Sequence, residues 1–156
     1  LFSDTIARNI AISDDELDIE RIRHAARVAN IADYVEALPL AYNTMIGQDG
    51  QGISQGQRQR ILIARVVYKN PMFVFLDEAT NALDANNERA ITENLSDFYK
   101  GKTVVVVAHR LSTVRNADQI VVLDDGKIVE VGTHEELTSK RGKYFALVKN
   151  QLELGN

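Results

Sequence analysis

The sequence of 156 residues contains no cysteine and no tryptophan, and it has only two prolines. Without cysteine, disulfide bonds, thiolate metal sites and a cysteine nucleophile are excluded. No apolar run approaches the roughly 20 residues that a membrane-spanning helix needs. The formal net charge of −4 argues against a nucleic-acid partner and provides no basic surface for lipid headgroups.

The apolar residues that are present suffice for a sizeable core. They make up 45% of the chain, whose length fits one domain or most of one. Apolar spacing and breaker residues predict three helices in the first part of the chain, over residues 18–30, 31–38 and 54–69. Residues 1–12 are expected to be an irregular lead-in and residues 43–52 a loop. Residues 1–70 are therefore predicted to form an α-helical unit.

After Pro71 the pattern changes to one typical of strands. Two short, unbroken apolar runs, 72–76 and 104–108, favour strands of a parallel sheet that are buried on both faces. Residues 87–99 lie between them and are expected to be the crossover helix of a βαβ unit. This alternation predicts the α/β fold class for residues 71–156.

The end of the chain carries two local signals. Asp124-Asp125-Gly126 predicts the turn of a hairpin between residues 119–123 and 127–131. Thr133 followed by Glu136 is a capping box, which opens a short helix. Residues 142–152 are expected to form a closing amphipathic helix.

The most informative stretch is 52–60, which reads Gly-Ile-Ser-Gln-Gly-Gln-Arg-Gln-Arg. Ser54 and Gln57 form a capping box, so a helix is expected to start there. A helix start offers unpaired backbone N–H groups and partial positive charge, both of which suit a phosphate. Gly56, without a side chain, lets a ligand approach the backbone closely. These residues alone favour an ordinary capped surface helix over a phosphate site.

Further motifs follow this stretch in a recognisable order. Ile53-Ser54-Gln55-Gly56-Gln57 resembles the signature motif of ATP-binding cassette (ABC) proteins, usually Leu-Ser-Gly-Gly-Gln. Three later segments resemble the Walker B segment, the D-loop and the switch histidine of that family, namely Phe73-Val74-Phe75-Leu76-Asp77-Glu78, Asn81-Ala82-Leu83-Asp84 and Ala108-His109-Arg110. The chain thus resembles the ATPase domain of an ABC transporter, of the exporter type, over essentially its whole length.

The resemblance implies a P-loop NTPase fold with a parallel sheet core. Residues 1–70 would be its α-helical signature subdomain, and residues 71–156 the C-terminal part of its RecA-like α/β core. The N-terminal part of that domain, with the phosphate-gripping P-loop, is expected to be missing from this chain. Gly101-Lys102-Thr103 imitates the end of a P-loop, but Ser96 stands where the motif needs glycine, and a helix precedes it where a strand is needed.

The resemblance also assigns roles to three residues that follow the predicted strands. It implies that Asp77 holds Mg²⁺, that Glu78 polarises the attacking water, and that His109 contacts the γ-phosphate. A metal holder beside a water-orienting carboxylate suits phosphoryl transfer, which depends on positioning and charge neutralisation. From the residues alone, the carboxylates equally suit capping of the next helix or turn, and His109 suits a structural role.

Nucleotide contacts across a dimer interface are implied for a second group of residues: Ser54, Gln55, Gly56, Gln57 and Asp84. Asp84 is also a candidate N-cap for the helix near residue 87. Gln55 departs from the family, which usually has glycine there, so its side chain is expected to crowd or hydrogen-bond the nucleotide. Gln48 stands in the loop before the signature where exporters usually carry glutamate, which puts a charge pair with the membrane domain in doubt.

The function implied is an ATPase that powers an exporter through ATP-driven dimerisation. Its expected partners are a second ATPase domain and a transmembrane domain, and its expected place is the cytoplasmic face of the membrane. The sequence around Asn81 resembles that of exporters of the bacteriocin type. One alternative is a signature-bearing ATPase of DNA repair or chromosome structure, and another is a non-catalytic fragment that supplies only signature groups. We expect Arg58, Arg60 and Arg65 to be a solvated face. The 156 residues alone are expected to have no ATPase activity. Transporters select their substrate in the membrane domain, so this sequence does not indicate the substrate.

Overall fold

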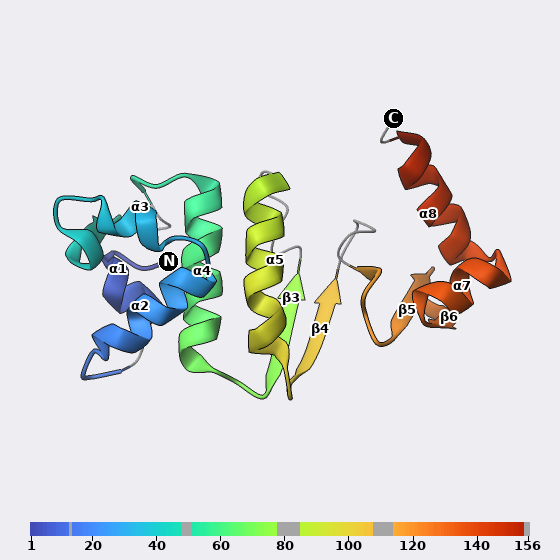
Figure 1. Cartoon of the computed structure of the whole chain (residues 1–156), viewed down its shortest axis with the longest axis horizontal. Coiled ribbons are helices and arrows are strands. Elements are labelled where there is room, and N and C mark those ends of the chain that lie inside the picture. The colour runs from blue at the N-terminus through green and yellow to red at the C-terminus, as the bar shows by residue number, and fades with distance from the viewer. Residues whose placement is uncertain (13, 48–50, 78–84, 108–113, 155–156) are drawn as a thin grey trace. The chain divides into compact units, whose positions relative to one another are not determined.

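The structure is a computed structural model that describes residues 1–12, 14–47, 51–77, 85–107 and 114–154 (Figure 1). The chain divides into two compact units, Leu1–Val105 and Val106–Asn156. The boundary expected after residue 70 lies inside the first unit and stays a prediction. Within the described ranges, no helix is both long and apolar enough to cross a membrane.

The first unit combines helices with short strands, and its boundary at Val105 falls within the last strand. Its elements are β1 (Asp4–Thr5), α1 (Ile6–Ile10), α2 (Ile19–Val28), α3 (Ala32–Glu36), the 3-10 helix η1 (Ala41–Asn43), β2 (Met45–Ile46), α4 (Gln55–Lys69), β3 (Phe73–Asp77), α5 (Ala85–Tyr99) and β4 (Thr103–Val107). The three helices expected in the first part of the chain are confirmed as α2, α3 and α4. Helix α5 confirms the expected crossover helix and begins slightly earlier.

The lead-in over residues 1–12 is not irregular, and this expectation was wrong. Strand β1 pairs antiparallel with β2, which lies inside the segment expected to be a loop. Thr5 caps α1 by accepting a hydrogen bond from the Arg8 backbone N–H (3.1 Å). The apolar residues of α1, such as Ile6 and Ile10, are fully buried. A five-residue helix shows too little periodicity to be recognised, and its stability comes from this burial.

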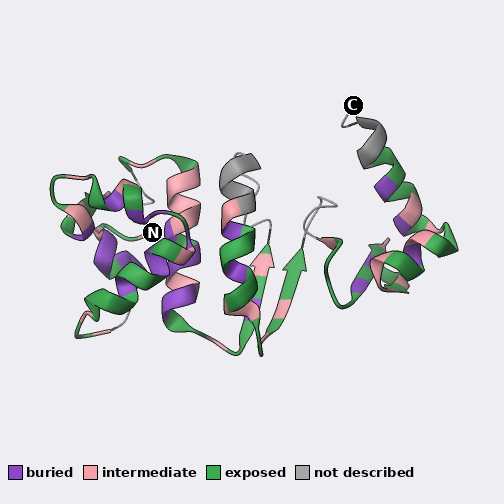
Figure 2. Cartoon of the chain, in the orientation of Figure 1, coloured by how far each residue is buried: buried purple, intermediate pink, exposed green. Residues whose placement is uncertain are grey.

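The core of the first unit lies among its helices, as the buried residues in Figure 2 show. Helices α2 and α4 together contribute a large share of it, because each has a continuous apolar face. The buried residues of these two helices are Ile22, Ala25, Ala26, Ile61, Ile63, Ala64, Val67 and Tyr68. Helix α4 ends at Asn70, which has left-handed backbone (φ 50°), and Pro71 then prevents its continuation.

Strands β3 and β4 are hydrogen-bonded neighbours and run in the same direction (Figure 1). They confirm the predicted strands and the parallel sheet. Burial on both faces was wrong, however: Val74 is buried, whereas Phe73 and Phe75 are 67% and 74% exposed. In the described part of the chain, these two strands pair only with each other, and the face of β3 that carries Phe73 and Phe75 is exposed.

The second unit confirms the predicted hairpin and capped helix. Strand β5 (Ile120–Asp124) pairs antiparallel with β6 (Lys127–Gly132). Asp125 and Gly126 both have positive φ, as a tight hairpin turn requires. Helices α7 (His134–Lys140) and α8 (Lys143–Leu154) follow. The small core of this unit contains Ile120, Val122, Leu137, Tyr144 and Val148.

Candidate functional site

Helix α4 begins with a closed capping box at Ser54. The Ser54 Oγ accepts a hydrogen bond from the Gln57 backbone N–H (3.2 Å), and the Gln57 Oε1 accepts one from the Ser54 backbone N–H (2.8 Å). Ser54 itself has extended backbone (φ −69°, ψ 162°), as an N-cap residue needs. The helix start predicted from the sequence is therefore confirmed. The hydroxyl proton of Ser54 is not used in this box, because the oxygen is the acceptor.

Two backbone donors lie between the bonds of the capping box. An α-helix leaves its first N–H groups without internal acceptors. Among the described residues, none accepts a hydrogen bond from the N–H of Gln55 or of Gly56. Ser54 and Gln55 are exposed and Gly56 is half-buried. The start of α4 therefore offers two N–H groups and one hydroxyl proton to a ligand.

The charges around this helix start favour an anion. The first turn of α4 contains no acidic residue. The half-buried Arg58 follows it, and the described residues provide no hydrogen-bond partner for the Arg58 Nε. The aligned peptide dipoles add about half a positive charge at the helix start. Backbone donors, a hydroxyl and positive charge together suit a phosphate group.

Asp77 lies at the end of β3 and is exposed. The carboxyl ends of parallel strands are where ligands bind in open α/β sheets. No group of three or more histidine, aspartate or glutamate side chains in the described ranges could hold a metal ion. A single exposed carboxylate still fits Mg²⁺, which keeps several waters and takes only one or two protein ligands. No hydrogen bond or ion pair between described residues joins Asp77 to the start of α4.

The other predicted site residues lie outside the described residues. They are Gln48, Glu78, Asp84 and His109, and the roles suggested for them stay predictions. The structure thus shows the signature segment and Asp77 at the ends of two different elements.

The expectation that Arg58, Arg60 and Arg65 form a solvated face was wrong. All three are half-buried. The Arg65 Nε donates to the Asn9 backbone oxygen (2.8 Å), and burial lowers the pKa of the Arg65 guanidinium. For Arg65 the reason is α1, the short helix that the sequence pattern did not reveal, since its Asn9 bonds to Arg65.

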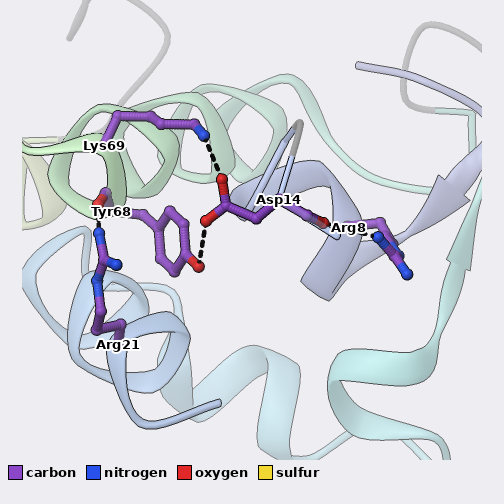
Figure 3. A network of polar contacts seen from close by, with 5 residues as sticks. All are labelled: Arg8, Asp14, Arg21, Tyr68 and Lys69. Carbon is purple, nitrogen blue, oxygen red and sulfur yellow. Dashed lines mark hydrogen bonds and ion pairs between the residues drawn. The ribbon is translucent and has the colours of Figure 1, made fainter. Parts of the chain in front are cut away.

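A polar network at the far end of α4 was also not predicted (Figure 3). The Asp14 carboxylate accepts hydrogen bonds from the Lys69 Nζ and the Tyr68 hydroxyl, each at 2.7 Å. These bonds, above all that from Lys69, hold the pKa of the Asp14 carboxyl below its usual range. The Arg21 guanidinium donates to the Tyr68 backbone oxygen (2.7 Å). The partners are more than 45 residues apart in the sequence, so no local pattern reveals them.

Comparison with known proteins extends this description. A sequence profile described as "ABC transporter" matches residues 2–81. An ATP-dependent lipid A-core flippase of Saccharophagus degradans is 50% identical over 151 residues, which are 97% of this chain and 26% of the flippase. ATP-binding cassette sub-family B member 5 of Homo sapiens is 47% identical, over 97% of this chain and 12% of that protein.

A solved structure, that of a bacterial Atm1-family ABC exporter with ATP bound, has a similar backbone. Its TM-score is 0.91 at 40% identity, over 97% of this chain and 26% of the exporter chain. The present chain therefore spans about a quarter or less of the length of these relatives.

Proposed function

This chain belongs to the ABC transporter family, and on that premise we propose that it forms part of the ATP-hydrolysing domain of an exporter. Its fold is that of an ABC ATPase. Two of the proteins that it matches are named as a flippase and an exporter, and both are much longer. The activity, the partners and the site residues proposed below therefore concern the assembled protein.

The start of α4 is the observation that carries this proposal. Its N–H groups at Gln55 and Gly56 lack acceptors within the described residues, and the Ser54 hydroxyl proton is unused. These donors suit the terminal phosphate of ATP. By the family resemblance, that nucleotide is held by a second ATPase domain, so Ser54, Gln55, Gly56, Gln57 and Asp84 act across a dimer interface.

On the opposite side of each nucleotide, we assign three residues of this chain to the hydrolysis reaction. Asp77 holds Mg²⁺, which neutralises phosphate charge when it is bound. Glu78 orients the attacking water through its carboxylate, and His109 donates a hydrogen bond to the γ-phosphate. The exposed position of Asp77 at the end of β3 supports its role, because it leaves room for metal-bound water.

The assembled protein would lie at the cytoplasmic face of a membrane. Closure and opening of its two ATPase domains would drive movement of its transmembrane domain. Gln55 replaces a glycine of the usual signature, and its exposed side chain at the first helical position can add a hydrogen bond to the nucleotide. Gln48 replaces a glutamate, so contact with the membrane domain relies on groups other than a charge pair at that position.

An ATPase of DNA repair or chromosome structure is less well supported. Such proteins insert long coiled coils, whereas the longest helices in the described residues, α4 and α5, have 15 residues each. Of the proteins described above, one is named as a flippase and another as an exporter. A fragment that supplies only signature groups remains the alternative that the following experiment addresses.

The proposal can be tested in a chimaera with the Saccharophagus degradans flippase. The 151 matched residues of this chain replace the corresponding residues of the flippase, which are 50% identical. Glu78→Gln keeps the size of the side chain but removes the carboxylate that orients water. We expect this chimaera to retain ATP and to lose nearly all turnover, measured as phosphate release and as bound nucleotide.

A matched control removes an exposed carboxylate elsewhere. Glu16→Gln changes the net charge equally and should leave both quantities unchanged. The assignment of Glu78 fails if its variant turns over ATP within a few-fold of the unsubstituted chimaera. A chimaera that closes on ATP but never hydrolyses it, even with Glu78 present, would favour the signature-only alternative.

A further inference from the structure

Asn9 is a polar residue at the centre of an apolar helix surface, with only 1% of its surface exposed. Its Oδ1 accepts a hydrogen bond from the Phe2 N–H (2.9 Å). Its Nδ2 donates to the backbone oxygens of Phe2 (3.0 Å), Asp4 (3.3 Å) and Thr5 (3.0 Å). Buried polar groups need such partners, because an unpaired one is costly. The N-terminal segment, residues 2–5, is therefore wrapped around the Asn9 amide.

Arg65 of α4 binds the same residue from the other side. Its Nε donates to the Asn9 backbone oxygen (2.8 Å), and its Nη2 lies 3.4 Å from the Asn9 Oδ1. Its guanidinium carbon also lies 5.7 Å from the centre of the Phe2 ring. The planar fork of arginine fits two acceptors at once, which a lysine ammonium does not. Asn9 thus joins the N-terminal segment to α4.

The N-terminal segment is also bonded to the chain just before the candidate site. Asp4 pairs with Ile46 across the β1–β2 ladder, and the Ile6 N–H donates to the Thr44 oxygen (3.0 Å). Residues 47–53 connect β2 to Ser54 along the chain. This connection starts at a strand that residues 4–6 bond and ends at a helix that Arg65 anchors. Asn9 bonds to Asp4, Thr5 and Arg65, so both anchors involve it.

We infer that Asn9 and Arg65 are positioning residues for the candidate site at Ser54. The inference rests on the proposed function, which gives that helix start a ligand. Arg65 lies eleven residues from Ser54, about 16 Å along the axis of α4. Over that length, a tilt of about 4° displaces the helix start by about 1 Å. A misplacement of that size can cost a reaction about 100-fold.

Two substitutions test the bridge without touching the candidate site. Arg65→Lys keeps the positive charge but replaces the two-pronged donor with a single ammonium. Asn9→Asp keeps the Oδ1 acceptor but places a second carboxylate oxygen against three backbone oxygens. Arg8→Lys is the matched control, because among the described residues the exposed Arg8 side chain makes one hydrogen bond, to the Asp14 backbone oxygen (2.9 Å), that lysine can replace.

The structural arm is hydrogen exchange on the 156-residue chain. We expect Arg65→Lys to speed exchange at the Ile6 amide by about tenfold, the effect of about one hydrogen bond to a charged group. Amides of α7 should exchange at their original rate, and Arg8→Lys should change neither. If Asn9→Asp does not fold, Arg65→Lys decides this arm alone. Unchanged exchange at Ile6 in Arg65→Lys overturns the inference.

The functional arm uses the flippase chimaera with Glu78→Gln, so that bound ATP persists. Closure of its two ATPase domains is followed by energy transfer between dyes at a cysteine introduced at the exposed Lys127. We expect Arg65→Lys to raise the ATP concentration for half-closure by about tenfold, while Arg8→Lys leaves it unchanged. A tenfold change corresponds to the loss of about one hydrogen bond to a charged group at the displaced helix start.

The outcomes separate the inference from the proposed function. If Ser54→Ala weakens closure and Arg65→Lys does not, the bridge is only structural and the inference is overturned. If Ser54→Ala itself leaves closure unchanged, the proposed function of the helix start fails, and the inference fails with it. Faster exchange at Ile6 together with weaker closure in Arg65→Lys supports the positioning role.

Discussion

Helices α4 and α7 start with the same capping box but differ in charge. At α4 the two bonds of the box measure 2.8 and 3.2 Å, and between Thr133 and Glu136 at α7 they measure 2.9 and 3.3 Å. The first turn of α7 contains Glu135 and Glu136, whereas the first turn of α4 contains no acidic residue. Carboxylates there complement the helix dipole and repel an anion. The capping box alone is therefore structural, and the absence of acidic residues in its first turn suits α4 to phosphate.

The two helices also differ in length and anchoring. Helix α4 has 15 residues, and Arg65, Tyr68 and Lys69 near its far end bond to Asn9 and Asp14. Helix α7 has seven residues and ends at Arg141, in left-handed backbone. A helix start can present donors in a fixed direction only if the rest of the helix is held. The bonds near the C-terminal end of α4 hold this helix, so its N-terminal end can present donors in a fixed direction.

The largest difference between the two helices is expected when the capping side chain is removed from each. Ser54→Ala and Thr133→Ala each lose one cap, about 1 kcal/mol, or about 2–4 °C in Tm for a chain of this size. Only Ser54→Ala also loses the hydroxyl that we propose bonds to phosphate, a charged hydrogen bond worth about 10- to 100-fold in ATP-driven closure. Thermal unfolding and closure of the chimaera measure the two effects. Equal effects of the two variants on closure would return Ser54 to a purely structural role.

A smaller and more specific effect is expected from making α4 resemble α7. Gln57→Glu keeps the capping box, since glutamate serves at that position, and improves the match to the helix dipole by about 0.3–1 kcal/mol. The same carboxylate repels phosphate, so closure should weaken by about threefold to tenfold. Stability and function should therefore change in opposite directions. Glu136→Gln in α7 is the control, and closure that improves in Gln57→Glu would contradict an anion at this site.

Local signals carried much of the fold. The Ser54 and Thr133 boxes, the turn at Gly126 and the helical spacing of α2 each depend on residues close together in the sequence, and each prediction was confirmed. The fold class and the family were also predicted, because four motifs stand in order along one chain.

Long-range contacts account for what the sequence did not reveal. Helix α1 is too short for a periodic pattern, and its capped, buried state depends on packing against α4. Arg65 was expected in solvent because its partner, Asn9, lies 56 residues away. Phe73 and Phe75 were expected to be buried because apolar runs indicate covered strands, but cover depends on which other segments pack there. The roles of Glu78, Asp84 and His109 stay predictions.

In the proposed function, the start of α4 acts on a nucleotide held by another ATPase domain. A triphosphate is gripped mainly by the backbone cradle and lysine of a P-loop, and no stretch of these 156 residues matches that motif. Isothermal titration of the 156-residue chain with Mg-ATP tests the claim most directly. We expect no binding with a Kd below about 1 mM. Binding in the micromolar range would contradict the claim, because it would show a complete phosphate site within this chain.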